Sequence, residues 1–303
     1  MNTSTKKNAE PSPQSNHELS RKLPLFYAGS LSGAFAKINA EFKGLHPDVE
    51  LVSEPAGSVT AIRRITEQNR ECGVVASADY RLIPQLMFPN YADWYINFAS
   101  EEIVLTYSEK SKYQDQINAS NWFEILQRED VKFGRSDPDQ DPGGYRTLLV
   151  WQLAEKYYNV PGFYQKLLNA KGDIVMGGNV RPGDIDYNFS YKAPAVQNNR
   201  KIITLPEEIN LSTKRFENYY AQAKVELKGS KSGETLTVIG EPILFGLTIP
   251  KNYPNQELAV SWVGFLLSSE GVAIMKNAGW TSIRPAITND INKVPKALIS
   301  RVK

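Results

Sequence analysis

Cysteine and histidine are scarce in this sequence of 303 residues, which contains one cysteine, Cys72, and two histidines, His17 and His46. A single cysteine excludes an intramolecular disulfide and argues against a cysteine-based metal or iron–sulfur site. Two histidines leave few ligands for zinc or copper. We therefore expect neither a resident metal ion nor a cofactor.

The sequence also lacks long apolar runs and an excess of charge of one sign. No run approaches the roughly 20 residues that span a bilayer, so we expect a protein that is not embedded in a membrane. Lys and Arg total 35 against 33 for Asp and Glu, which gives a formal net charge of +2. Nucleic-acid-binding proteins usually carry a concentrated basic face, so no nucleic-acid partner is expected.

The segment 1–22 lacks aromatic residues and is rich in Ser, Asn, Pro and Lys. Such a composition buries too little apolar surface to become ordered, so we expect a disordered polar tail. The segment also lacks the apolar core of a signal peptide. Two interpretations stay open: a cytosolic protein, or an exported one whose signal is removed and whose tail tethers a folded domain to an anchor outside this sequence.

After the tail, the hydrophobic pattern alternates between strand and helix. Strands are predicted at 24–28, 49–53 and 73–76, with helices at 32–42 and 58–69 between them. This β-α-β-α-β order favours a parallel sheet that helices cover on both faces.

The rest of the chain predicts a second α/β unit inserted into the first. A middle section has its own strands and a strong helix at 144–158, and an apolar strand at 243–249, followed by two helices, leads back to the first unit. We therefore predict two α/β lobes, one formed by 23–103 with 246–303 and the other by 104–245. Small ligands commonly bind in the cleft between such lobes.

Glycine and serine follow three predicted strands of the first lobe, at 29–33, 56–58 and 77–79, and the first two of these junctions open a helix. Free backbone N–H groups at a helix N-terminus favour an anion, and small residues let an oxyanion approach. Ligands bind at the carboxyl ends of the strands in such sheets. Any one of these serines could be only a helix N-cap, but the three junctions together predict an anion site. Its serines are Ser30, Ser58 and Ser77.

Two loop motifs carry carboxylates. One is SDPDQDPGGYR at 136–146, directly before the strong helix, and the other is LPEEINL at 205–211. Taken singly, Asp141 is most simply a helix N-cap, and the adjacent Glu207 and Glu208 are most simply a solvated turn.

Together, these segments resemble the tungstate- and molybdate-binding proteins of ABC importers. The resemblance rests on GSL at 29–31, GS at 57–58, SADY at 77–80, DPGGYR at 141–146 and LPEEINL at 205–211. It extends over essentially the whole chain after the tail. It implies an α/β fold of the two-lobed, type II periplasmic-binding-protein class, with the oxyanion in the cleft between the lobes.

The resemblance also implies the residues of the site. In this class, two protein carboxylates complete a six-coordinate metal centre in the oxyanion. The matching positions here are Asp141 and Glu208, with Glu207 as the alternative if the register of that loop differs by one. Hydroxyls and amides around the three serines would hold the oxo groups, and Tyr191 would line the cleft.

An independent argument explains why carboxylates would serve such a site. Two carboxylates beside a dianion are repulsive by roughly several kcal/mol at an intermediate dielectric. Sulfate and phosphate have saturated tetrahedral centres, whereas tungsten(VI) and molybdenum(VI) can accept further hard oxygen donors. The same carboxylates would therefore favour tungstate and repel sulfate. Arg146, one turn into the helix after Asp141, is expected to form a surface salt bridge.

We therefore expect the non-catalytic substrate-binding component of an ABC importer for tungstate and molybdate. It would act as a monomer in the periplasm or otherwise outside the membrane, with a lipid anchor as one option, and would close on the anion and present both lobes to a permease. Two alternatives stay open. A receptor for sulfate or phosphate would have neutral donors or a cation in the cleft. A metal-dependent hydrolase would use Asp141 and Glu208 as an acid–base pair or as Mg²⁺ ligands, although no nucleophile motif accompanies them.

Overall fold

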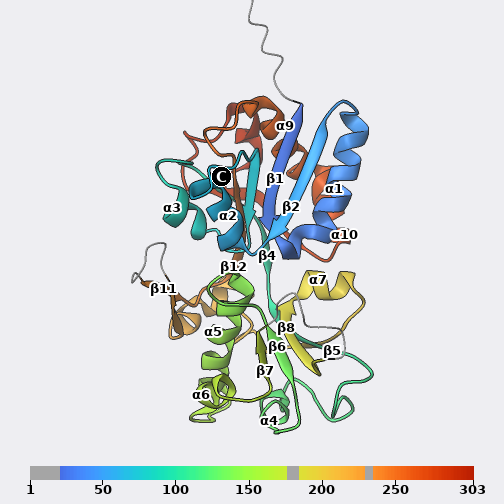
Figure 1. Cartoon of the computed structure of the whole chain (residues 1–303), viewed down its shortest axis with the longest axis vertical. Coiled ribbons are helices and arrows are strands. Elements are labelled where there is room, and N and C mark those ends of the chain that lie inside the picture. Colours follow the sequence, from blue (N-terminus) through green and yellow to red (C-terminus); the bar gives the residue numbers. More distant parts are fainter. Residues whose placement is uncertain (1–20, 176–183, 229–234) are drawn as a thin grey trace, which may run out of the picture.

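The computed structural model describes residues 21–175, 184–228 and 235–303. It has two lobes stacked along its longest axis (Figure 1). Almost all of the predicted polar tail lies outside the described residues, and the first strand already begins at Lys22.

The first lobe is built on a six-stranded sheet with the strand order β13-β4-β12-β3-β1-β2. β1 pairs in parallel with β2 and β3, whereas β12 and β13 are antiparallel to their neighbours. The parallel arrangement predicted for the first three strands is therefore correct, and the sheet as a whole is mixed. Its strands are β1 (Lys22–Ala28), β2 (Glu50–Ala56), β3 (Val74–Ser77), β4 (Ile96–Glu101), β12 (Ile243–Thr248) and β13 (Thr281–Thr288).

Helices cover both faces of this sheet because successive side chains of a strand point to opposite faces. On one face, Tyr27 packs edge-to-face on Phe35, with ring centroids 5.0 Å apart, and Phe35 packs on Trp262. On the other face, Phe26 joins a separate apolar cluster with Ile62. The first face carries α1 (Ser32–Leu45), α9 (Gln256–Leu266) and α10 (Ser269–Asn277), and the second carries α2 (Ser58–Thr66) and α3 (Leu82–Met87).

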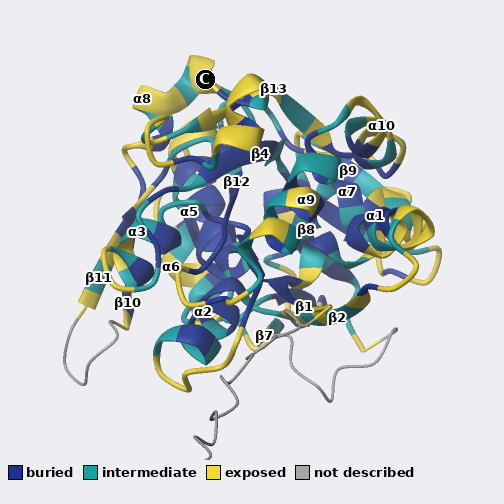
Figure 2. Ribbon diagram, turned by 90° about the horizontal axis from the view of Figure 1, so that it is seen from above, coloured by how far each residue is buried: buried dark blue, intermediate teal, exposed yellow. Residues whose placement is uncertain are grey.

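The second lobe contains a five-stranded sheet with the order β7-β6-β8-β5-β9. Trp151 of the long helix α5 packs edge-to-face on Phe133 and Phe189 of this sheet, at 5.7 and 5.6 Å between ring centroids. The strands are β5 (Ile103–Tyr107), β6 (Phe133–Arg135), β7 (Asp173–Val175), β8 (Tyr187–Tyr191) and β9 (Lys201–Thr204). The helices are α4 (Trp122–Ile125), α5 (Pro142–Tyr157), α6 (Phe163–Leu168), α7 (Lys192–Gln197) and α8 (Glu217–Tyr220). Figure 2 shows buried residues on the inner sides of the elements and exposed residues on their outer sides.

A hairpin of β10 (Lys224–Lys228) and β11 (Thr235–Ile239) extends from the second lobe. Leu236 of this hairpin packs against the apolar cluster of α2 and α3, so the hairpin contacts the first lobe. Three short 3-10 helices complete the described elements. They are η1 (Gly29–Leu31), η2 (Lys214–Phe216) and η3 (Lys296–Arg301).

Two adjacent strands connect the lobes. β4 ends at Glu101, β5 begins at Ile103 in the second sheet, and the chain returns through β12, whose first residue Ile243 pairs with Glu101. Ile103 therefore belongs to the second sheet and Ile243 to the first, whereas the predicted lobes assign Ile103 to the first lobe and 243–245 to the second. The connection is visible at the centre of Figure 1.

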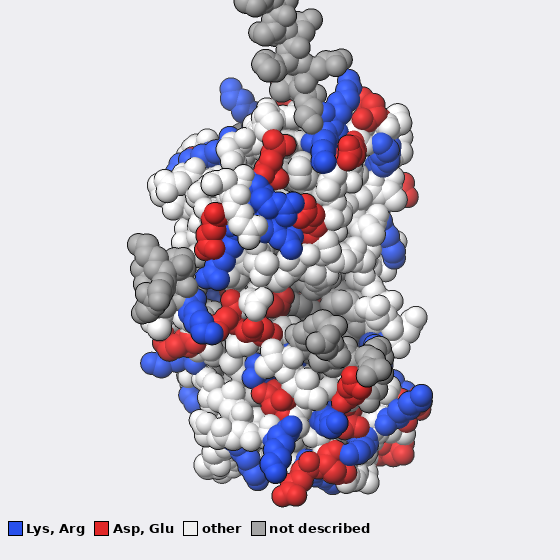
Figure 3. All heavy atoms as spheres, in the orientation of Figure 1, with Lys and Arg blue, Asp and Glu red and all other residues white. Residues whose placement is uncertain are grey.

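Charged side chains of both signs are interspersed over both lobes on the face seen in Figure 3. Among the described residues, no single helix is long and apolar enough to cross a membrane. The pair α9 and α10, bent by 60° at their break, passes that test only jointly, by length and composition.

Candidate anion-binding site

The three junctions of glycine and serine lie side by side at the carboxyl ends of β1, β2 and β3. The strand register aligns Ala28 with Ala56, and Tyr27 with Ala76. The hydroxyl of Ser58 accepts a hydrogen bond from the backbone N–H of Ala78 at 2.9 Å, which fastens the second junction to the third. The junctions therefore converge on one edge of the sheet, as the strand order predicts.

The three serine hydroxyls have different partners. Ser77 Oγ donates to the carbonyl of Asp79 at 2.6 Å and accepts from its N–H at 3.1 Å, so it shapes its own turn. Ser58 uses only its acceptor side, and Ser30 Oγ is buried with no hydrogen-bond partner. Neither caps a helix, because the N-cap of α2 is Gly57 and η1 has no side-chain cap. Ser30 and Ser58 are thus able to donate to a bound anion.

Asp141 stands on the opposite side, at the N-terminus of α5. Its Oδ1 accepts the backbone N–H of Gly143 at 2.7 Å, so it is the N-cap of that helix. Burial raises the pKa of Asp141, which the Gly143 N–H and Arg146 partly oppose. A Cβ on Gly143 would lie 2.9 Å from Asp141 Oδ1 and 3.7 Å from the ring of Tyr191. The start of α5 and Tyr191 therefore form one wall.

The two walls touch across the boundary between the lobes. A Cβ on Gly57 would lie 2.3 Å from the carbonyl oxygen of Gln140 and 3.5 Å from the Cβ of Asp141. The junction that carries Ser58 thus faces the loop that carries Asp141. A second contact is the hydrogen bond from Gln197 Nε2 to the carbonyl of Ala278 at 2.6 Å.

An open cavity of about 490 Å³ adjoins this second contact. Ser30 and Ser32 line it from the first lobe, and Pro194 and Gln197 line it from the second. The lobes are therefore in contact both at Gly57 and beside the cavity that Ser30 lines, which is the arrangement expected of a closed binding protein.

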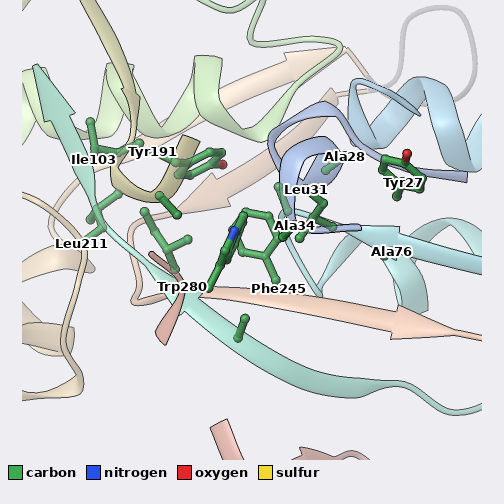
Figure 4. Close-up of a cluster of buried hydrophobic side chains, with 14 of the residues drawn as sticks. Tyr27, Ala28, Leu31, Ala34, Ala76, Ile103, Tyr191, Leu211, Phe245 and Trp280 are labelled. Atoms are coloured by element: carbon green, nitrogen blue, oxygen red, sulfur yellow. The ribbon is translucent and has the colours of Figure 1, made fainter. Parts of the chain in front are cut away.

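Tyr191, at the end of β8, has a fixed ring and a directed hydroxyl. Its ring packs edge-to-face on Phe245 of β12 at 5.3 Å, and Phe245 packs on Trp280 at 4.8 Å (Figure 4). Its hydroxyl accepts a hydrogen bond from Arg146 Nη1 at 2.9 Å. Burial raises the pKa of Tyr191 above its usual range, so the hydroxyl keeps its proton at neutral pH. That proton is available to a ligand.

Arg146, expected on the surface, is only 2% exposed and belongs to a polar network that crosses between the lobes. Its Nη2 lies 3.7 Å from Oδ2 of Asp79 in the first lobe, and the same oxygen accepts from Tyr145 of the second lobe at 2.6 Å. Arg81 also donates to Asp79, at 2.7 Å. Burial alone would raise the pKa of Asp79, but the charges of Arg81 and Arg146 favour the carboxylate and hold this pKa well below its usual range.

The sequence analysis missed this network. Asp79 ends the third junction, and Tyr145 and Arg146 end the DPGGYR motif, so both segments had been singled out without their charged side chains being paired. No local pattern marks a contact between residues so far apart in the chain.

The prediction that Glu208 joins Asp141 stays a prediction, and the turn that carries Glu208 is held near the end of α5. Besides burial, the charge of Glu208 raises the pKa of Tyr158 and Tyr219. Tyr158 directly follows α5, whose 16 residues span about 24 Å from the cap Asp141. The Tyr220 hydroxyl donates to the carbonyl of Glu207, and the neighbouring Tyr219 hydroxyl donates to the carbonyl of Leu153, near the end of α5, at 3.5 Å. Glu208 therefore lies toward the far end of α5.

The alternative residue, Glu207, is exposed and pairs with Arg215 at 3.0 Å. The physical reason is the turn itself: Ile209 and Asn210 are buried, and their N–H groups bond to the carbonyl of Pro206. This turn leaves the Glu207 side chain on the surface. No group of three or more His, Cys, Asp or Glu side chains that could hold a metal ion occurs in the part of the chain that the structure describes.

Comparisons with known proteins place this fold in a family. The model of the bacterial extracellular solute-binding proteins matches residues 23–281. A solute-binding protein of Petrotoga mobilis is 42% identical over 292 residues, which cover 93% of this chain and 90% of the relative. The molybdate/tungstate-binding protein WtpA of Pyrococcus abyssi is 39% identical over 300 residues, covering 88% of this chain and 86% of the relative.

Two solved structures show the same architecture. The periplasmic molybdate-binding protein of Azotobacter vinelandii has a TM-score of 0.63 at 18% identity, covering 86% of this chain and 98% of that one. The sulfate-binding protein SubI of Mycobacterium tuberculosis has a TM-score of 0.59 at 15% identity, covering 86% and 87%. The predicted two-lobed periplasmic-binding-protein fold is confirmed, and the chain belongs to the bacterial extracellular solute-binding proteins.

Proposed function

We propose that this protein captures tungstate or molybdate between its lobes, outside the membrane, and delivers it to the permease of an ABC importer. The relatives from Pyrococcus abyssi and Thermococcus kodakarensis that are named molybdate/tungstate-binding proteins support this ligand class. In this proposal the protein is a monomer with no catalytic activity, and the oxyanion is its cargo.

The observation that carries the proposal is the contact between Gly57 and the loop of Asp141. In our proposal, the hydroxyls of Ser30 and Ser58 face the partly buried carboxylate of Asp141 across this contact. Hydroxyl donors suit the oxo groups of any oxyanion, but a carboxylate repels an anion whose central atom cannot accept a further ligand. A site that combines the two favours an oxyanion whose metal centre can expand its coordination.

We assign the oxo groups to donors from both lobes. Ser30 and Ser58 donate from the first lobe, and the Tyr191 hydroxyl donates from the second. Ser77 acts indirectly, because its hydroxyl is used by the turn that it shapes. N–H groups at the start of a helix favour negative charge, which adds to the attraction.

Asp141 is the carboxylate that we assign to the metal centre. Asp79, a buried carboxylate of the first lobe, already accepts hydrogen bonds from Arg81 and Tyr145. Because the turn that carries Glu208 is held near the end of α5, we propose a site with one protein carboxylate, where the family resemblance implied two. The repulsion of sulfate would then depend on Asp141 alone.

Isothermal titration of the ligand-free protein at neutral pH tests the proposal with tungstate, molybdate, sulfate and phosphate in turn. We expect one-to-one binding of the first two and no heat from the others. Binding of sulfate or phosphate alone would keep the receptor role and overturn the metal chemistry. Silence from all four anions would favour a hydrolase.

A further inference from the structure

Arg146 links three groups from both lobes through a single guanidinium. Its Nη1 donates to the carbonyl oxygen of Ala78 in the first lobe and to the hydroxyl of Tyr191 in the second. Its Nη2 is buried, has no hydrogen-bond partner and lies 3.7 Å from Oδ2 of Asp79. The side chain therefore contacts both the boundary between the lobes and a residue of the anion site.

The first-lobe partner of Arg146, Asp79, is also held by a neighbour in its own lobe, and that neighbour, Arg81, donates to the carbonyl of Ile239 in the hairpin at 2.9 Å. Asp79 accepts from the backbone N–H of Arg81 at 2.9 Å and from its guanidinium at 2.7 Å. When the lobes touch, this carboxylate stands against Arg146, and both side chains are 2% exposed. Charges that are removed from water interact more strongly, so this pair distinguishes the closed arrangement from an open one.

The second-lobe partner of Arg146 has one free rotation. The edge-to-face contact with Phe245 fixes the ring of Tyr191, so only the direction of its O–H bond can change. A guanidinium can donate hydrogen bonds but cannot accept them. The bond from Arg146 therefore occupies an acceptor position of the Tyr191 oxygen and leaves its proton for another group, with Gly143 directly beside the ring.

We propose that Arg146 is a positioning residue that couples closure of the lobes to the orientation of the Tyr191 hydroxyl at the anion site. This inference rests on the proposed function, because the anion is what the oriented hydroxyl would bind. In the closed arrangement, Ala78 and Asp79 hold the guanidinium where it bonds to Tyr191. When the lobes separate, those two contacts are lost and the hydroxyl is no longer directed.

A double-mutant cycle tests the coupling. Asp79→Asn alters the first-lobe contact, and Tyr191→Phe removes the hydroxyl at the site. The two residues lie in different lobes, and the structure gives no hydrogen bond between them. We expect each single change to raise the Kd for tungstate. The fold increase in Kd of the double variant should be smaller than the product of the two single fold increases, by about fivefold or more.

Two further variants make the cycle decisive. Asp173→Asn is the matched control, because Asp173 pairs with Arg135 at 2.7 Å within the second lobe, and both side chains are less than a tenth exposed. The fold change in Kd that Asp173→Asn causes should simply multiply with the fold change that Tyr191→Phe causes. If Asp79→Asn does not fold, as judged by circular dichroism, Tyr145→Phe replaces it, since it removes the 2.6 Å hydrogen bond to Asp79 without changing a charge.

The outcomes separate this inference from the proposed function. Suppose that the parent protein binds tungstate, but that the fold changes in Kd of Asp79→Asn, or of Tyr145→Phe, simply multiply with that of Tyr191→Phe. This result overturns the coupling and leaves the proposed function intact. A parent that binds only sulfate or phosphate overturns the proposed ligand, and the cycle is then measured with that anion. If the parent binds none of the four anions, both the function and the coupling fail.

Discussion

The Ser58 hydroxyl accepts a hydrogen bond from the backbone N–H of Ala78 at 2.9 Å, so one buried side chain ties two neighbouring junctions of the anion site together. Ser58→Ala leaves that buried N–H without a partner, which costs about 1–3 kcal/mol of unfolding free energy. It also removes a proposed donor to the anion, so we expect the Kd for tungstate to rise by about tenfold or more, given about 1.4 kcal/mol for each factor of ten.

Denaturant unfolding and isothermal titration measure these two effects. Ser32→Ala is the control, because the Ser32 hydroxyl donates only to the carbonyl of Gly29, at an exposed position. We expect it to change the unfolding free energy by no more than about 0.5 kcal/mol. Equal behaviour of the two variants would contradict the role given to Ser58.

Removing the charge of Asp141 should change the affinity for anions, whereas removing the charge of Glu208 should not. Asp141→Asn keeps an acceptor for the Gly143 N–H but removes the charge, so tungstate affinity should fall by about tenfold or more, given about 1.4 kcal/mol for each factor of ten. Sulfate binding should be unchanged or stronger, because the repulsion is lost. Glu208→Gln should bind tungstate as the parent does. Titration of both variants with both anions checks this, and loss of tungstate binding in Glu208→Gln would restore the two-carboxylate site.

Gly57 is expected to matter for closure and not for folding. The Cβ of Gly57→Ala would meet the backbone carbonyl of Gln140, in the other lobe, at 2.3 Å. The lobes therefore could not approach as they do here, and tungstate should dissociate faster. Stopped-flow kinetics measures the dissociation rate, and small-angle scattering should show a more extended molecule with the anion bound.

Gly44→Ala is the matched control for Gly57→Ala. Gly44 lies in α1, where a Cβ would have nothing within 4 Å. Alanine is favoured over glycine in a helix by about 0.8–1 kcal/mol, so this variant should be slightly more stable and should bind as the parent does. If both variants release tungstate at the parent's rate, closure does not require the contact at Gly57.

Glu101 gives the protein a pH-dependent stability. Burial at the connection between the lobes raises the pKa of Glu101 from 4.5 to about 8, and the neighbouring charge of Glu102 adds to this shift. The folded state therefore keeps a proton that the unfolded chain has lost. The free energy of unfolding should fall as the pH rises from about 5 to about 8, by at most about 1.4 kcal/mol per pH unit.

Chemical denaturation at a series of pH values measures this slope. Both oxygens of Glu101 accept a backbone N–H, from Glu102 and Ala193, so the NH2 group of Glu101→Gln leaves one of these without an acceptor. The variant should therefore be less stable than the parent near pH 5, and its unfolding free energy should not fall between pH 5 and pH 8 as that of the parent does. Parallel pH profiles for the two proteins would show that Glu101 does not titrate in this window.

Much of the fold could be predicted where the hydrophobic pattern is local and regular. The strand predicted at 103–107 is present with those bounds, and the helix at 144–158 is present as Pro142–Tyr157. β4 was not predicted, because it is buried on both faces and contains the buried polar residue Asn97, so its side chains do not alternate in polarity. Parallel strand order also predicted that the three junctions meet.

The site was harder to predict, because it depends on which way a loop turns. Asp141 precedes a helix, and N-capping fixes the direction of its side chain locally. Glu208 follows an edge strand, and the buried residues Ile209 and Asn210 decide its direction. The approach of Asp79 to Arg146 results from the assembly of two lobes, which no short segment specifies.

The adjacency of β4 and β12 has a consequence for how binding free energy is used. Because Glu101 and Ile243 pair where the two strands leave the first sheet, the lobes are joined by a two-stranded ribbon. A hydrogen-bonded ribbon bends more easily across its flat face than within its plane, so the lobes have essentially one rotation available. Closure then follows a single path, so little of the anion's interaction free energy is lost in ordering one lobe against the other.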